Sequence, residues 1–249
     1  MNNKIRYITS TKNKRLADKQ TSALVTVVLV YHSFISRMKS FGNIAMIAIG
    51  NQEKLIDRHI KIITKKFPNY ELIISVGYEA FKIQQYVNKK YKHLNIRCVE
   101  NTQYADSNVC ETIRLGINNT YNNKILIVNG CMIFEEKLLD QVMQNDIETV
   151  VTNANNDTLD IGINIDETNK YVEHISYGAI NNKWCELMYL GKDSIINEVK
   201  KSLASSDFKT KIFYEFINSL INKNIKIKYI KSDAKMWKIN NVNDSRNDL

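Results

Sequence analysis

The chain has 249 residues, and 44% of them are hydrophobic, which is enough to bury the core of one large α/β domain or of two small ones. The longest apolar run near the N-terminus is too short to cross a bilayer, and the segment before it lacks a signal-peptide cleavage pattern, so we expect a cytoplasmic protein without a membrane partner. The four cysteines have no paired spacing, which excludes a zinc knuckle and a disulfide framework.

The formal net charge of +9 is concentrated at the N-terminus. Before residue 24 only Asp18 opposes the basic residues Lys4, Arg6, Lys12, Lys14, Arg15 and Lys19. This pattern predicts a basic N-terminal arm over residues 1–23, followed by one domain over residues 24–249. We expect the arm to contact a protein partner. Nucleic acid is disfavoured because aromatic residues are not interleaved with the charges.

Strand-length apolar runs alternate with helical patterns through the first half of the chain. Residues 24–31, "LVTVVLVY", predict a first strand that is buried on both faces. Apolar residues at helical spacing predict a helix over 53–67, which Pro68 ends. The pattern continues as strand 71–77, helix 79–91, strand 95–100, helix 109–121, strand 124–130 and helix 135–143. This order is typical of β-α-β units around a mainly parallel sheet.

The second half of the chain has shorter and more alternating runs. Strands are predicted within 148–154, 160–167, 170–178 and 184–192, then helices over 193–204 and 208–223, a strand over 225–231 and a terminal segment over 236–248. Alternation of this kind predicts a mixed or antiparallel extension of the sheet. The expected fold class is therefore α/β, with a mainly parallel sheet flanked by helices.

Several local strings, in this order, resemble the nucleotidyltransferases that join an NTP to a sugar phosphate or to phosphocholine. Residues 28–51 are similar in register to the family's strand, Ala-Ala-Gly-x-Gly-[Ser/Thr]-Arg loop and later Pro-Lys pair. Further similar strings are "SVGYEAFKIQQYV", "ENTQYADSNVCETIRLG", "ILIVNGCMIFEEKLL" and "MWKINNVNDSRND", the last matching a closing Trp-x-Glu-Ile-Asp segment. The resemblance covers roughly residues 24–246. It implies a Rossmann-like fold related to the GT-A glycosyltransferases.

The resemblance also implies which residues would contact a nucleotide or its acceptor. They are Tyr31, His32, Ser33, Ser36 and Arg37 in the first turn, and Asn101, Tyr104, Ser107 and Asn108 in the loop after the third strand. A simpler interpretation stays open for the second group, because an Asn- and Asp-rich turn that caps a helix needs no ligand. Weak nucleotide binding is compatible with either interpretation.

The phosphate loop departs from the family's pattern. Its two glycines fall on Ser33 and Ile35, and a β-branched residue resists positive φ and places carbon where a phosphate oxygen would sit. The Pro-Lys pair falls on Asn43 and Ile44, which removes the expected ammonium group. Arg37 is retained. Arg37 and Lys39 are the remaining candidates for a catalytic cation.

The metal positions implied by the resemblance are changed as well. The aspartate of the family's Gly-Asp turn corresponds to Cys131, and the aspartate of its closing segment corresponds to Asn240. Mg²⁺ prefers charged oxygen ligands, whereas a thiol is soft and an amide is neutral. Asp244 and Glu135 are the candidates for compensation. We expect no cofactor, and Mg²⁺ only if the protein is an active enzyme.

These departures favour a nucleotidyltransferase-like protein that has lost catalysis and serves as a binding or assembly module. The Asn-, Lys- and Ile-rich composition is common in phages and some bacteria, so a phage particle is one setting, with the host cytoplasm or the virion as location. The alternative is an active NTP-dependent enzyme acting on phosphocholine or a sugar phosphate. His59, His93 and His174 show no metal-ligand spacing, and we expect Cys131 to be inert.

Overall fold

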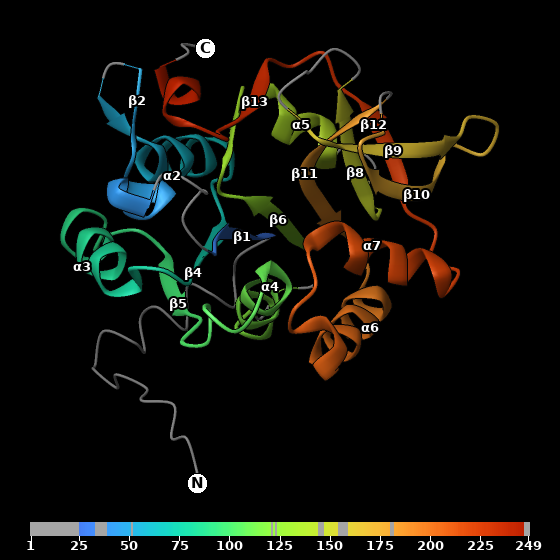
Figure 1. Cartoon of the computed structure of the whole chain (residues 1–249), viewed down its shortest axis with the longest axis horizontal. Helices are drawn as coiled ribbons and strands as arrows, with labels where there is room; N and C mark the ends of the chain where they lie inside the picture. The colour runs from blue at the N-terminus through green and yellow to red at the C-terminus, as the bar shows by residue number, and fades with distance from the viewer. Residues whose placement is uncertain are drawn as a thin grey trace, which may run out of the picture.

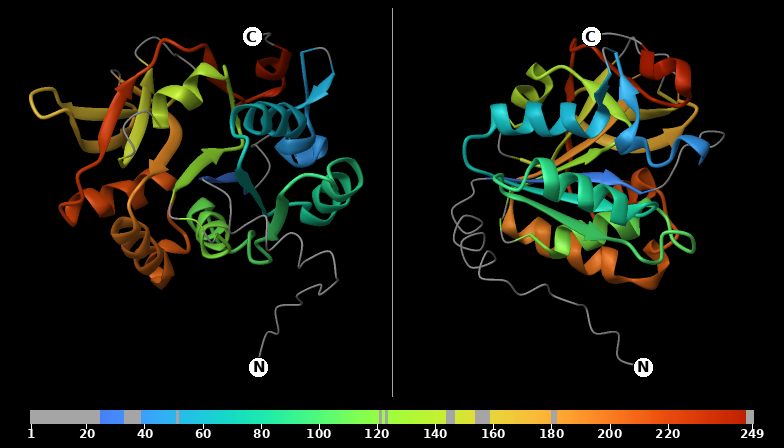
Figure 2. Two further views of the ribbon diagram at one scale, coloured as in Figure 1. Left: turned by 180° about the vertical axis from the view of Figure 1, so that it is seen from behind. Right: turned by 90° about the vertical axis from the view of Figure 1, so that its left-hand side faces the viewer.

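The computed structural model describes residues 25–32, 39–50, 52–120, 122, 124–143, 147–153, 159–179 and 182–246 (Figure 1). The predicted basic arm lies outside the described residues. Within them, a nine-stranded sheet carries helices on both of its faces, as the edge-on view in Figure 2 shows. The predicted α/β class, a Rossmann-like sheet with a mixed extension, is confirmed.

Four parallel strands form the first half of the sheet, in the order β5-β4-β1-β6. Their bounds are β1 (Val25–Tyr31), β4 (Tyr70–Val76), β5 (Ile96–Glu100) and β6 (Ile125–Asn129). Every residue of β1 is buried, as expected for a central strand that is covered on both faces. Parallel pairing brings the carboxyl ends of all four strands to the same edge.

The second half of the sheet is mixed. It contains β11 (Lys183–Leu190), β8 (Thr149–Asn153), β12 (Lys228–Lys231), β10 (Tyr171–Tyr177) and β9 (Ile161–Asp166). β11 is antiparallel to β6, whereas β12 is parallel to β8. Gly162 of β9 also pairs with Lys183 of β11, so these five strands close into a ring.

The sheet separates two hydrophobic cores, and helices cover each of them. One face is covered by α2 (Leu55–Lys66), α3 (Ala80–Lys90) and α5 (Lys137–Met143), and the other by α4 (Val109–Asn118), α6 (Asp193–Ala204) and α7 (Phe213–Asn222). In α2, Leu55, Ile56, Ile60 and Ile63 recur on the buried side. No helix within the described ranges combines the length and apolar content needed to cross a bilayer.

Two small antiparallel pairs complete the fold. One is β2 (Ala48–Ile49) with β3 (Glu53–Lys54), and the other is β7 (Met132–Phe134) with β13 (Met236–Lys238). The 3-10 turns are η1 (Lys39–Phe41), η2 (Ile44–Met46), η3 (Ser206–Phe208) and η4 (Val242–Arg246). The β7–β13 pair places β13 beside the turn that follows β6.

A buried charge network fixes the amino edge of the parallel strands. Glu71 is fully buried, accepts a 2.6 Å hydrogen bond from the Thr26 hydroxyl and forms an ion pair with Arg97. Arg97 also donates to the backbone oxygen of Asn119. A buried carboxylate must be paired and hydrogen-bonded, so these residues have a structural role at the amino edge. The opposite edge carries the candidate site.

Candidate nucleotide site

The candidate site lies at the carboxyl edge of the parallel strands, where the loops after β1, β4, β5 and β6 meet. In open α/β sheets, ligands bind at this edge. The loop after β1 contains Ser33, Ser36 and Arg37, which lie outside the described residues together with the rest of 33–38. Lys39, which follows in η1, is exposed. The predicted roles of these four residues therefore stay predictions.

Tyr31 is a core residue. Its side chain is 1% exposed, and its hydroxyl lies 2.6 Å from Nδ1 of His59, which is equally buried. The second nitrogen of His59, Nε2, lies 2.7 Å from the backbone oxygen of Met132. The side chain of Tyr31 therefore packs in the core between α2 and β7, and its predicted contact with a nucleotide stays a prediction.

The protonation of His59 follows from these two contacts. Burial lowers the pKa of His59 to about 4, so the imidazole is neutral near pH 7. A backbone oxygen can only accept, so Nε2 carries the hydrogen, and Nδ1 accepts a hydrogen bond from the Tyr31 hydroxyl. Both ring nitrogens of His59 are thus hydrogen-bonded, and the residue links Tyr31 to β7 behind the first turn.

His32 and Asn101 join the first turn to the loop after β5. Nδ1 of His32 lies 2.7 Å from the Thr112 hydroxyl, to which Asn101 donates at 2.9 Å. Asn101 also donates to Ser107 at 3.0 Å and is 1% exposed. Burial lowers the pKa of His32, against a backbone hydrogen bond at Ser107 that raises it. These predicted residues are brought together, and they bond chiefly to one another.

The loop after β5 holds its shape through local contacts. The side chain of Asn108 accepts from the backbone N–H of Val109 at 2.8 Å and caps α4. The ring of Tyr104 packs edge-on against Tyr78, with centroids 5.9 Å apart. A Cβ on Gly77 would lie 2.0 Å from the backbone oxygen of His32, so only glycine permits this approach. The loop is therefore ordered without any need for a ligand.

The residues at the expected Pro-Lys positions belong to the interior. Asn43 is fully buried; its amide donates to the backbone oxygen of Tyr78 at 2.7 Å and accepts from Ala45 at 3.0 Å. Ile44 is 1% exposed and packs in the core beneath α2. Asn43 thus ties the start of η2 to the loop after β4. A lysine at either position would bury its charge.

The two turns at the implied metal positions meet in space. The backbone N–H of Ile239 donates to the oxygen of Cys131 at 2.9 Å, which places Asn240 close to the turn after β6. Burial raises the pKa of the Cys131 thiol to about 12, so it is protonated at neutral pH. This agrees with the expectation of an inert cysteine.

An ion pair that we did not predict lies beside these turns. The ammonium group of Lys238 in β13 pairs with the carboxylate of Glu186, which also accepts a hydrogen bond from Asn129. Asn129 in turn accepts from the backbone N–H of Cys131 at 3.1 Å. Both charges of the pair act on the Cys131 thiol. The pair therefore lies beside the turn that holds Cys131.

Glu186 reaches this position through an irregular strand. It lies in a bulge of β11, between Trp184 and Met188, and its φ of 51° is in the left-handed region. Bulges re-aim side chains, and a left-handed non-glycine residue is strained. Nothing in the sequence pairs Glu186 with Lys238.

The predicted compensating carboxylates are engaged elsewhere. Asp244 accepts from the backbone N–H groups of Asn240 at 2.7 Å and Asn241 at 3.0 Å, closing its own turn. Glu135 accepts from the backbone N–H of Lys235 at 3.0 Å. Among the described residues, no cluster of three or more His, Cys, Asp or Glu side chains could hold a metal. A protonated thiol, an amide and an ammonium group do not fit Mg²⁺.

Comparison with known proteins supports the fold. Neither a protein-family model nor a curated protein sequence matches this chain. Solved structures do match. A UDP-glucose pyrophosphorylase complexed with UDP-glucose superposes with a TM-score of 0.71 at 10% identity, over 90% of this chain and 96% of that one. The chain has the nucleotidyltransferase fold.

Two further nucleotidyltransferases show the same architecture. The inositol-1-phosphate CTP transferase from T. maritima has a TM-score of 0.68 at 14% identity, with 89% of this chain and 91% of that chain covered. The CTP:phosphocholine cytidylyltransferase from Streptococcus pneumoniae has a TM-score of 0.65 at 18% identity, with 89% and 96% covered. The resemblance in the sequence is confirmed at the level of the fold.

Proposed function

We propose that this protein keeps the nucleotidyltransferase fold as a binding or assembly module and does not transfer nucleotidyl groups. The observation that supports the proposal is the Glu186–Lys238 ion pair beside Cys131 and Asn240. In-line attack on an α-phosphorus needs a divalent cation held by carboxylates, because the metal neutralises charge that develops in the transition state. Here the carboxylate beside these turns, Glu186, is already paired with an ammonium group.

The charge balance around the turn argues against Mg²⁺. Burial opposes the charge of Lys238, but Glu186 outweighs burial, so the pKa of Lys238 is raised and the ammonium persists. Glu186 is neutralised by this partner. A dication entering the turn would meet a carboxylate already paired with an ammonium group, and only weak ligands in the neutral thiol and amide.

The loop after β5 is compatible with binding in the absence of catalysis. His32, Asn101, Ser107 and Thr112 satisfy one another, so the loop is preformed rather than assembled by a substrate. Its order is also what the alternative would need, namely an active NTP-dependent enzyme acting on phosphocholine or a sugar phosphate. The two possibilities differ in one respect: only the enzyme requires Mg²⁺.

Nucleotide titration distinguishes these possibilities. Purified protein is titrated with CTP, ATP, GTP and UTP, with and without Mg²⁺, while the melting temperature is followed; a bound ligand stabilises the fold by RT ln(1 + [L]/Kd). We expect any nucleotide-induced stabilisation to be the same with and without Mg²⁺. We also expect no pyrophosphate release with phosphocholine or glucose 1-phosphate. Mg²⁺-dependent stabilisation accompanied by pyrophosphate release would overturn the proposal.

Restoring the acidic pair tests the placement of the metal site. Cys131→Asp combined with Asn240→Asp is expected to create affinity for Mn²⁺, and adding Lys238→Met with Glu186→Gln to increase it further. Cys131→Ser combined with Asn241→Asp is the control, because Asn241 is exposed one residue away. If the folded restored variants bind Mn²⁺ no better than the control, Cys131 and Asn240 are not the metal positions.

The assembly role itself rests on the basic arm, residues 1–23, as the protein-binding element. Its setting in a phage particle rests on composition. Limited proteolysis of the full chain with and without a candidate partner tests the arm: protection of peptide bonds within residues 1–23 supports the role. Two results together would contradict a role for the arm: protease cleaves it equally fast in the complex, and the complex forms equally well when residues 1–23 are deleted.

A further inference from the structure

β5 is an open edge of the nine-stranded sheet. It pairs with β4 on one side, and within the described part of the chain no strand pairs with it on the other. The right-hand view in Figure 2 faces this side of the molecule and shows β5 running along the front. Every residue of β5 is partly or fully exposed, whereas β4 is buried from Glu71 to Val76. The edge is therefore accessible to a further strand.

The hydrogen bonds to β4 show which backbone groups of β5 point outward. The backbone N–H of Leu72 donates to the oxygen of Asn95 at 3.0 Å, and the N–H of Asn101 donates to the oxygen of Val76 at 2.7 Å. Successive residues of a strand direct their N–H and C=O groups to opposite sides. Positions 95, 97, 99 and 101 therefore face β4, and positions 96, 98 and 100 face the open edge.

Most of the outward groups lack a partner. The N–H of Ile96 donates to the oxygen of Leu94 at 3.0 Å. The carbonyl of Ile96 and both backbone groups of Cys98 and Glu100 have no hydrogen-bond partner among the residues that the structure describes. An exposed row of such groups is a template for pairing with another strand.

The edge has few of the features that keep sheet edges apart. Natural edge strands are guarded by proline, lysine, bulges or inward-pointing charges. β5 has the sequence Ile-Arg-Cys-Val-Glu, and its register with β4 runs without interruption. Its cation, Arg97, is drawn into the ion pair with the buried Glu71. The charge that remains at the edge is that of Glu100.

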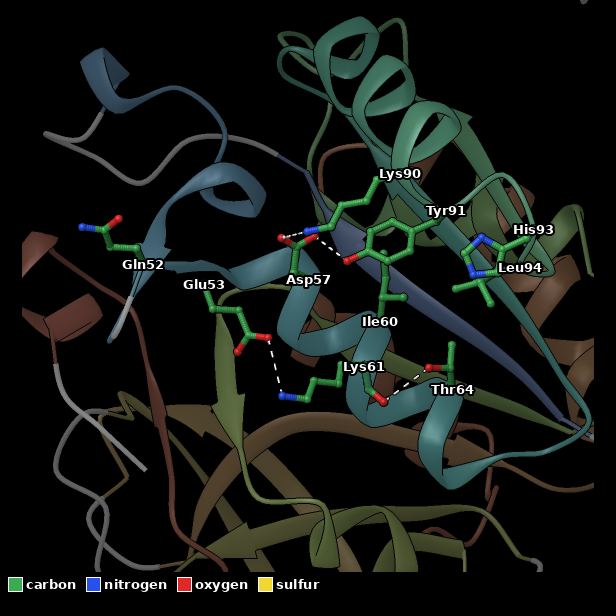
Figure 3. Close-up of a pocket in the computed structure, with 10 residues that line it drawn as sticks. All are labelled: Gln52, Glu53, Asp57, Ile60, Lys61, Thr64, Lys90, Tyr91, His93 and Leu94. Carbon is green, nitrogen blue, oxygen red and sulfur yellow. Dashed lines mark hydrogen bonds and ion pairs between the residues drawn. The ribbon is translucent and has the colours of Figure 1, made fainter.

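The segment that leads into β5 is held in place by α2. The hydroxyl of Tyr91 donates to the carboxylate of Asp57 at 2.7 Å, and Lys90 pairs with the same carboxylate at 2.7 Å. Figure 3 shows these side chains, together with His93 and Leu94, among the residues that line a pocket beside α2. The backbone N–H of Leu94 donates to the oxygen of Tyr91 at 3.0 Å and closes a turn. The start of β5 is therefore fixed before a partner binds.

The charges at the two ends of β5 complement each other when the strand is reversed. Lys92 lies in the turn before β5 and Glu100 at its end; both are exposed, and neither has an ion-pair partner among the described residues. Antiparallel pairing of two identical strands brings the end of one beside the start of the other. Glu100 of each copy then approaches Lys92 of the other, which stabilises the pair. Parallel pairing would bring like charges together.

We propose that two copies of this chain pair through β5, antiparallel, about a two-fold axis at Cys98. In this register the Cys98 residues of the two copies donate to each other's carbonyl oxygen, and Glu100 of each copy donates to the Ile96 oxygen of the other. The Glu100 oxygen faces the N–H of Ile96, which Leu94 already binds. The two sheets then form one continuous sheet. Pairing at this edge is independent of nucleotide titration, so the two proposals succeed or fail separately.

Sedimentation equilibrium of the full chain over a wide range of concentrations tests this proposal. Glu100→Lys and Lys92→Glu each place like charges together, and each is expected to raise the dimer Kd about tenfold or more. The double variant exchanges the two charges and should return the Kd to within about threefold of the parent. Glu173→Lys makes the same charge change at an exposed position in β10 and should also stay within about threefold.

Hydrogen exchange locates the contact. The amides of Cys98 and Glu100 should exchange about tenfold or more slowly in the dimer than after dilution, whereas the amide of Ile96, which is bonded within its own chain, should not change. A monomer at every concentration, a dimer without this protection, or a charge exchange that fails to restore pairing at an unchanged melting temperature would overturn the proposal. So would protection that is independent of concentration and is lost when residues 1–23 are deleted, because the arm would then occupy the edge.

Discussion

Lys238 and Glu186 are 52 residues apart in the chain and form an ion pair at the turn after β6, with side chains that are 21% and 7% exposed. The pair links β13 to the bulge in β11, and through Asn129 it reaches the turn that holds Cys131. A carboxylate and an ammonium group that satisfy each other at low exposure contribute little attraction to a third ion. The local structure therefore depends on both partners.

Removing one partner of this pair should destabilise the fold. Lys238→Met leaves the Glu186 carboxylate buried without its cation, and we expect the free energy of unfolding to fall by about 3 kcal/mol in urea denaturation. Lys223→Met removes one partner of the exposed pair with Glu198, 2.7 Å apart, and should cost less than about 1 kcal/mol. Adding Glu186→Gln to Lys238→Met should recover part of the loss, and equal costs for both single variants would contradict the interpretation.

His59 should make stability depend on pH in mildly acid solution. Its pKa is lowered to about 4 in the folded protein by burial, whereas an unfolded histidine titrates near pH 6.5. The unfolded state therefore binds the proton first, and this contribution, complete above about pH 6.5, is lost as the pH falls toward 4. The loss approaches about 3 kcal/mol. His59→Gln should lose this part of the pH dependence, and an unchanged slope would contradict the assignment.

Gly130 should tolerate no side chain. A Cβ at this position would lie 2.3 Å from the Tyr31 ring and 2.7 Å from the backbone oxygen of Val30. We expect Gly130→Ala to reduce the free energy of unfolding by about 2–3 kcal/mol, because the core must shift. Gly178→Ala is the control, since its φ of 76° adds strain in open space, at a cost of about 1 kcal/mol. A smaller loss at Gly130 than at Gly178 would mean that Tyr31 moves freely.

The cysteine thiols should be unreactive in the native protein. Burial raises the pKa of Cys98 and of Cys131 to about 12, and it also raises the pKa values of Cys110 and Cys185. A thiol reagent at pH 7.5 is expected to modify all four only after urea unfolds the chain, because the thiolate is the reactive form. Rapid labelling of Cys131 in the folded protein, located by peptide mapping, would contradict the raised pKa of this thiol.

The sequence predicted the strands of the fold better than the contacts of the site. Continuous apolar runs located β1 and β6 within one residue, because central parallel strands are buried on both faces. The same pattern did not predict on which side of the sheet the Tyr31 side chain lies, because a nearly continuous apolar run does not distinguish the two faces of a strand. The helix predicted over 208–223 begins only at Phe213, in α7, because residue 208 belongs to the preceding 3-10 turn η3 and the apolar period does not mark where the helix starts.

The site depended on contacts that no local pattern contains. Glu186 faces Lys238 only because β11 bulges, and Lys238 lies beside Met132 only because β13 pairs with β7. Asn43 was predicted as a lost Pro-Lys position, and its burial with three hydrogen bonds depends on the loop after β4. Such long-range pairings follow from topology, and a single sequence leaves them undetermined.

The hydrogen bonds through Tyr31, His59 and Met132 have a fixed direction. The hydroxyl donates to the imidazole, and the imidazole donates to a peptide oxygen that has no hydrogen to pass on. A proton released at the first turn could therefore not pass along the hydrogen bonds through Tyr31, His59 and Met132. Any acid–base chemistry in this protein would therefore have to exchange protons with bulk water from the open side of the sheet edge.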